Sequence, residues 1–182
     1  MTVEDLSKVE SDLQDLEVLK SLYKSKTLPV LTTIKGYCSF MCITFKVDSD
    51  EEQVLISNHT PEIEEEEEDY CEISVTATAV KLHIHSEAEV VQHDCKEWTT
   101  LFVECNSDET TTNFKYDING KVGSYMRASK DINEIGVAFG SRYDSSLPTN
   151  GQVLALDFYS INQPSQFPEE LKKILIYKHT LT

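Results

Sequence analysis

The chain has 182 residues, of which 40% are hydrophobic, and it carries a formal net charge of −16 at pH 7. This length suits one domain, and the hydrophobic fraction is large enough to build a core, which excludes an intrinsically disordered body. Binding to nucleic acid or to an anionic membrane requires clusters of Lys and Arg, yet 16 basic residues stand against 32 acidic ones. The charge therefore argues against both partners and favours cationic proteins or metal ions.

Residues 1–27 are predicted to form an N-terminal amphipathic helix that ends before Pro29. Its apolar stripe is built from residues three and four positions apart, namely Leu6, Val9, Leu13 and Leu16. Two interpretations of this stripe remain open. The helix packs across the rest of the domain, or it forms a short coiled-coil seam that binds a partner helix or a second copy of the chain.

Residues 28–182 are predicted to form the β domain, with an acidic loop at about 48–69. The loop contains an unbroken run of five glutamates, which are Glu64, Glu65, Glu66, Glu67 and Glu68. Like charges in a run repel one another, so the segment is expected to be solvated. It serves solubility and edge protection, or it binds calcium or a basic partner, although its spacing does not match an EF-hand loop.

The β domain is predicted from apolar side chains that alternate with polar ones. The alternating stretches are 73–76, 80–84, 101–105, 114–118, 135–139 and 154–158. Asn119-Gly120 predicts a two-residue hairpin turn, because both residues tolerate a positive φ. In 37–45 the odd and the even positions are both largely apolar, which predicts a strand covered on both faces. Beyond Pro168, the pattern favours a helical turn that runs into a final strand.

The stretches that carry candidate chemistry favour structural roles. His83 and His85 share one strand face, as zinc ligands can, but Lys81 lies on the same face, so we expect a polar solvent-facing surface and no metal. Cys95 lies close to His93 in sequence, and a partly buried thiol beside a surface histidine is favoured over a nucleophilic pair. Neither a nucleophile-elbow nor a phosphate-loop motif occurs, so the chain is not expected to be an enzyme.

The five cysteines form an odd number and contain no Cys-x-x-Cys pair. The first thirty residues are acidic and amphipathic, unlike a secretory signal peptide. Reduced thiols in an intracellular, cytoplasmic protein are therefore expected. The alternative is a secreted protein whose leader has been removed, with two disulfide bonds and one unpaired thiol.

Four stretches resemble the central hairpins of concanavalin A-like jelly rolls, especially laminin G-like and pentraxin-like modules. These stretches are Trp98–Cys105, Phe114–Lys121, Ile135–Arg142 and Gly151–Tyr159. The resemblance extends over about 72–161 and implies a mainly β, two-sheet antiparallel jelly-roll sandwich. Members of this group that bind calcium use Asp and Asn side chains on rim loops. By this resemblance, the nominated ligand rim comprises Asn119, Arg142, Tyr143 and Asp144.

The expected function is that of a non-catalytic recognition or assembly module that binds another macromolecule, with a protein partner favoured. The N-terminal helix and the glutamate run are the nominated partner-binding segments, and self-association through the helix is one form of this hypothesis. A calcium- or glycan-binding lectin-like adhesion module is the first alternative. An acidic decoy that captures basic proteins is the second.

Overall fold

The computed structural model describes residues 32–33, 38–57, 71–84, 87–107, 110–128, 136–139, 147, 151–161 and 169–180. The predicted N-terminal helix, the run Glu64–Glu68 and the rim residues Arg142, Tyr143 and Asp144 lie outside these ranges. The described elements are β1 (Thr32–Thr33), β2 (Cys38–Lys46), β3 (Gln53–Ser57), β4 (Cys71–Val75), β5 (Ala79–Ile84), β6 (Glu87–Gln92), β7 (Thr99–Ser107), β8 (Thr111–Ile118), β9 (Lys121–Ala128), β10 (Gly136–Phe139), β11 (Gln152–Ile161) and α3 (Glu169–Thr180).

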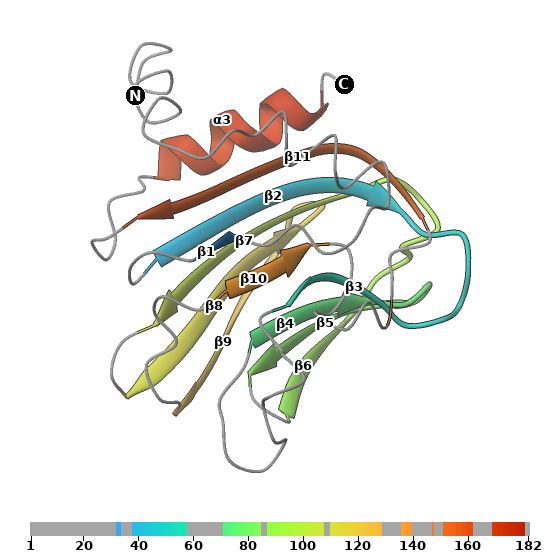
Figure 1. The fold of residues 1–182 in the computed structure, drawn as a ribbon. Coiled ribbons are helices and arrows are strands. Elements are labelled where there is room, and N and C mark those ends of the chain that lie inside the picture. The colour runs from blue at the N-terminus through green and yellow to red at the C-terminus, as the bar shows by residue number, and fades with distance from the viewer. Residues whose placement is uncertain are drawn as a thin grey trace.

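The strands form two sheets that face each other across the core (Figure 1). One sheet has the strand order β1-β10-β3-β4-β5-β6, and the other has the order β11-β2-β7-β8-β9. Every pair of neighbouring strands is antiparallel. The prediction of a mainly β protein built from two antiparallel sheets is therefore confirmed.

The core lies between the sheets and consists of alternate residues from the facing strands. Its largest fully buried side chains are Phe45, Met41, Ile43, Leu55, Leu82, Ile84, Leu101, Ile118 and Leu156. Fully burying one such side chain stabilises the fold by about 1.5–3 kcal/mol. The alternation therefore determines which residues of each strand remain available on its outer face.

The predicted orientation of one side chain in β11 is wrong. Leu154 was predicted to share the core-facing side with Leu156, but it is 39% exposed. The register between β11 and β2 shifts between Val153 and Ala155, so Leu154 is the extra residue of a β-bulge. The bulge allows both Val153 and Leu156 to face the core.

Two further elements differ from the expected secondary structure. The final strand is absent from 169–180, because this segment is helical from its first residue to its last. Within the segment 48–69 that was predicted to be a loop, residues 53–57 form β3 and pair with β4. Val54 and Leu55 are fully buried there, so burial of this short apolar stretch outweighs the acidic composition around it.

Helix α3 covers the outer side of the five-stranded sheet (Figure 1), where it contacts β2 and β7. Cys42 of β2 and Phe102 of β7 face away from the core, and each is at most 4% exposed. Leu175 is the fully buried residue on the helix side. The prediction that β2 is covered on both faces is thus confirmed. None of the described helical residues forms a segment long and apolar enough to cross a membrane.

The turn between β8 and β9 has the geometry that the sequence predicts. Asn119 has a φ of 49° and Gly120 a φ of 90°, which are close to the values of a type I′ turn. The Asn119 side chain also binds the start of β7, because Oδ1 accepts from the Thr100 N–H at 2.8 Å and Nδ2 donates to the Trp98 carbonyl at 3.3 Å. The turn is therefore held to the neighbouring strand.

The backbone at Gly151, directly before β11, lies very close to the end of β2. A Cβ at this position would collide with the backbone carbonyl of Lys46, which cannot move without disturbing the sheet. We expect Gly151→Ala to lower the free energy of unfolding by about 1–3 kcal/mol, measured by urea denaturation. Gly120→Asn is the comparison, because nothing lies within 4 Å of that Cβ, so its loss reports only the backbone strain of a φ of 90°, which asparagine adopts more readily than most residues. An equal or larger loss in Gly120→Asn would contradict the assigned cause.

Candidate binding face on the six-stranded sheet

The outer face of β4 and β5 carries a set of polar side chains. Ile73 of β4 and Leu82 of β5 face the core as a cross-strand pair, so their neighbours Ser74 and His83 face outward. Lys81 lies directly opposite Ser74 across the same two strands. The outward position of Lys81 and His83 agrees with the predicted parity of β5.

Glu52, just before β3, joins these side chains into one hydrogen-bonded network. Its Oε1 accepts from Ser74 Oγ at 2.9 Å and from Lys81 Nζ at 3.4 Å. His83 Nε2 lies 2.9 Å from Ser74 Oγ and 3.9 Å from the same Glu52 oxygen. A hydroxyl has a single proton and a carboxylate only accepts, so Ser74 donates to Glu52 and His83 Nε2–H donates to Ser74. We call these four residues the outer-face network.

The outer-face network is partly open to solvent. The side chains of Glu52, Lys81 and His83 are 35%, 29% and 17% exposed, whereas Ser74 is buried. On β6, Val90 lies directly opposite Lys81 and is 49% exposed. The face therefore combines a positive charge, a carboxylate and an imidazole with an adjacent apolar side chain.

The charge state of Glu52 is determined by competing effects. Burial raises the pKa of its carboxyl, but the hydrogen bond from Ser74 and the charge and hydrogen bond of Lys81 outweigh it, so that the pKa lies below the ordinary value of 4.5. The carboxylate is therefore ionised at neutral pH and holds the lysine and the serine in place.

A second polar pair continues the network toward β3. Ser57 Oγ donates to Glu72 Oε1 at 2.8 Å, and these residues are 0% and 1% exposed. Glu72 is the residue of β4 that lies opposite His83. The outer face is thus polar and ordered from β3 to β5, with its accessible part at β5 and β6.

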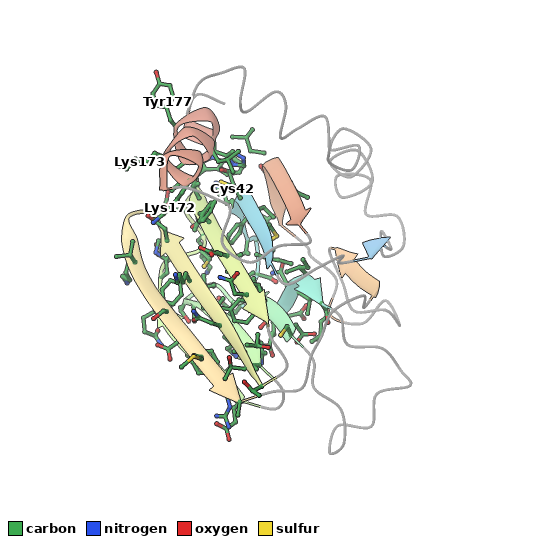
Figure 2. All side chains as sticks on the ribbon, turned by 90° about the vertical axis from the view of Figure 1, so that its left-hand side faces the viewer. Cys42, Lys172, Lys173 and Tyr177 are labelled. Atoms are coloured by element: carbon green, nitrogen blue, oxygen red, sulfur yellow. The ribbon has the colours of Figure 1, made fainter. Side chains whose placement is uncertain are left out.

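The outer face of the other sheet is covered by α3 over β2 and β7. His179 Nδ1 lies 2.9 Å from Thr44 Oγ1 of β2, and Lys172 Nζ lies 3.2 Å from Asp117 Oδ2 of β8. Figure 2 shows Lys172 on the sheet side of the helix and Tyr177 on the side away from it. Since α3 occupies the outward surface of β2 and β7, that surface is unavailable to a ligand.

The structure places the nominated site residues as follows. Asn119 lies in the β8–β9 turn, where both side-chain atoms of its amide bind the backbone of Trp98 and Thr100. Its role in a ligand rim stays a prediction, as do the roles of the other nominated residues, which lie outside the described ranges. The sequence analysis did not identify the outer-face network, because Glu52 is distant in sequence from β5 and was assigned to a solvated loop.

Cys95 and His93 do not form a nucleophilic pair. His93 Nε2 lies 2.9 Å from Thr99 Oγ1, and the Cys95 thiol is directed at the Ala79 carbonyl 3.8 Å away. Burial, and secondarily the charge of Asp94, raises the pKa of the Cys95 thiol to about 12. The residue is therefore a protonated core thiol at neutral pH.

No disulfide joins the four cysteines whose side chains are described, Cys42, Cys71, Cys95 and Cys105. Among the described residues, no group of three or more His, Cys, Asp or Glu side chains is placed to hold a metal ion. Calcium binding by the undescribed segments stays a prediction.

The low pKa of Glu52 has a consequence for stability. A depressed carboxyl pKa contributes stability that is present above the unfolded value and lost as the pH falls through the folded value. We expect Glu52→Gln to lower the free energy of unfolding by about 0.5–1 kcal/mol at pH 7, because the pair is partly solvated. The difference from the wild type should shrink as the pH falls below 4.5 and through the lowered pKa of the folded state, measured by urea denaturation across pH. Glu51→Gln, an exposed neighbour, should show neither effect; a loss independent of pH would refute the electrostatic account.

Thiol labelling tests the environment of Cys95. In the native protein at pH 8, we expect iodoacetamide to alkylate half-buried Cys105 at least about tenfold faster than fully buried Cys95, because alkylation requires an accessible thiolate. Peptide mass spectrometry after timed quenching measures the two rates. In urea the two rates should converge, and equal rates in the native state would show that Cys95 is not buried as described.

No protein-family model and no curated protein matches the chain. Solved structures do match. The CBM40 module of Ruminococcus gnavus IT-sialidase, in its complex with α2,3-sialyllactose, has 15% sequence identity and a TM-score of 0.53, over 78% of this chain and 83% of that one. A heptameric SAP-like pentraxin from Limulus polyphemus has 12% identity and a TM-score of 0.50, over 74% and 72%.

Domains LG4-5 of the mouse laminin α1 chain have 10% identity and a TM-score of 0.45, over 76% of this chain and 45% of that one. The assignment of the fold rests on the CBM40 module and the pentraxin, together with the strand order of the two sheets. At these identities the likeness concerns the fold alone. The chain has the concanavalin A-like jelly-roll fold.

Proposed function

We propose that the protein is a non-catalytic recognition module that binds glycans on the outer face of β4, β5 and β6. The observation that carries this proposal is the outer-face network, in which Glu52, Lys81 and His83 are fixed by one another and remain partly exposed. This proposal develops the lectin-like alternative of the sequence analysis, and a protein ligand on this face is the competing outcome.

The chemistry of the network suits sugar hydroxyls. Each hydroxyl both donates and accepts a hydrogen bond, so a glycan site needs donors and acceptors at fixed positions. Lys81 supplies a donor and the second carboxylate oxygen of Glu52 supplies an acceptor, while His83, whose Nε2–H donates to Ser74, helps to hold them in place. Val90, beside Lys81, offers an apolar contact for the C–H surface of a sugar ring. Because the network is ordered before a ligand arrives, binding loses little side-chain entropy.

The location of the network supports the same proposal. Helix α3 covers the centre of the outer face of the five-stranded sheet, whereas no described helix lies over the outer face of the six-stranded sheet. The fold is shared with a carbohydrate-binding module whose structure contains α2,3-sialyllactose. That likeness alone does not transfer a ligand, but it makes glycans the first class to test.

A glycan array of neutral and sialylated oligosaccharides, followed by calorimetric titration of the strongest binder, tests the proposal. We expect Lys81→Ala to weaken binding about tenfold or more, because a hydrogen bond to a charged group contributes about 1.5–3 kcal/mol. His83→Ala should also weaken binding, because Ser74 loses the partner that orders the network. Lys173→Ala, which removes an exposed lysine from α3, should leave the affinity unchanged.

Two outcomes would overturn the proposal. One is the absence of binding to every glycan on the array by correctly folded protein. The other is a glycan affinity that neither Lys81→Ala nor His83→Ala reduces. Repeating the titration in EDTA and in millimolar calcium tests the calcium-dependent form of the hypothesis, because only a calcium-dependent site would lose its affinity in EDTA.

A further inference from the structure

The sandwich has a second polar surface at the side where β6 and β9 face each other. In the described part of the chain, each of these strands is the last of its sheet. Two side-chain contacts connect them at opposite ends. Lys121 Nζ donates to the Gln92 carbonyl at 2.7 Å, and Arg127 forms an ion pair with Glu87. The two strands are therefore fixed relative to each other along their length.

Three half-buried side chains lie between these two contacts. Glu89 is paired with the core residue Leu82 and so faces the other sheet, and Tyr116 and Tyr125 of β8 and β9 pack against the core from that sheet. Gly123 lies opposite Tyr116, and a Cβ there would collide with the Tyr116 hydroxyl. The glycine thus leaves room for this phenol. We call Glu89, Tyr116 and Tyr125 the edge cluster.

The polar groups of the edge cluster have no partner in the described part of the chain. No Lys, Arg or His of the described ranges forms an ion pair with Glu89, and the nearby Arg127 is already paired with Glu87. Neither phenol hydroxyl forms a hydrogen bond there. Burial raises the pKa of both tyrosines, and the Glu89 carboxylate, which faces the same side of the sandwich, raises it further.

A carboxylate beside two aromatic rings is a suitable environment for a cation. The ring faces attract positive charge, an interaction that contributes about 0.5–2 kcal/mol for each ring, and the carboxylate adds a charge-assisted hydrogen bond. Such a group would supply a counter-ion that the described residues do not give to Glu89. It would also offset the effect of the Glu89 carboxylate on the pKa of both phenols.

We propose that the edge cluster binds a lysine or arginine side chain of a basic polypeptide. The net charge of −16 attracts such a partner from a distance. On the opposite, outer side of β9, Val122 and Met126 are 65% and 64% exposed, and they offer apolar contacts to a polypeptide that passes over this edge strand. This surface is separate from the outer-face network, so the inference does not depend on glycan binding.

Fluorescence anisotropy with a labelled peptide of alternating lysine and leucine residues tests the inference. We expect Glu89→Gln to weaken binding about tenfold relative to Glu97→Gln, a matched variant that removes the same charge from an exposed site. Tyr125→Leu should weaken binding similarly, whereas Tyr125→Phe, which keeps the aromatic ring, should retain it. Lys81→Ala should not change the peptide affinity, which separates this site from the proposed glycan face.

Equal losses in Glu89→Gln and Glu97→Gln would overturn the inference, because they would show attraction by net charge alone. The absence of peptide binding to the wild type at low salt would do so as well. A thermal melt of each variant shows whether a loss of peptide binding results from misfolding. Glu89→Gln should melt at or above the wild-type temperature, since it removes a half-buried carboxylate to which the described residues give no counter-ion.

Discussion

The burial of β2 on both sides is the constraint on which the rest of the structure depends. Met41, Ile43 and Phe45 fill the core, and the alternate residues Cys42 and Thr44 are also buried, on the outer side. A strand without a solvent-facing side needs a layer on each face. The six-stranded sheet supplies one layer and α3 supplies the other, so that β2 lies in the middle layer of a three-layer arrangement.

This arrangement makes the two outer faces of the sandwich unequal. One face is used to complete the fold, through Leu175 and the contact between His179 and Thr44. The other has no described helix over it and carries an ordered polar network around Glu52. The two proposed recognition surfaces, on the six-stranded sheet and at the side where β6 and β9 meet, both lie away from α3.

Much of the fold could be predicted from the sequence, because the alternation of apolar residues reports directly on which side of a strand is buried. The same reasoning placed Lys81 and His83 on an outer face. It did not identify Glu52 as their partner, because that contact joins segments far apart in the chain. The C-terminal segment fits a helix and a strand almost equally well, and only the tertiary burial of Leu175 and His179 selects the helix.

The position of α3 has a consequence for biosynthesis. Strand β2 is made early, yet its hydrogen-bonding partner β11 and its outer cover α3 are among the last described segments to leave the ribosome. Until then, Phe102 and the outer side of β2 expose apolar surface next to an unpaired strand edge. Contacts between segments so distant in sequence slow folding, and exposed edges promote aggregation. The nascent chain is thus most vulnerable until β11 and α3 have emerged, and binding by chaperones would be most beneficial before that point.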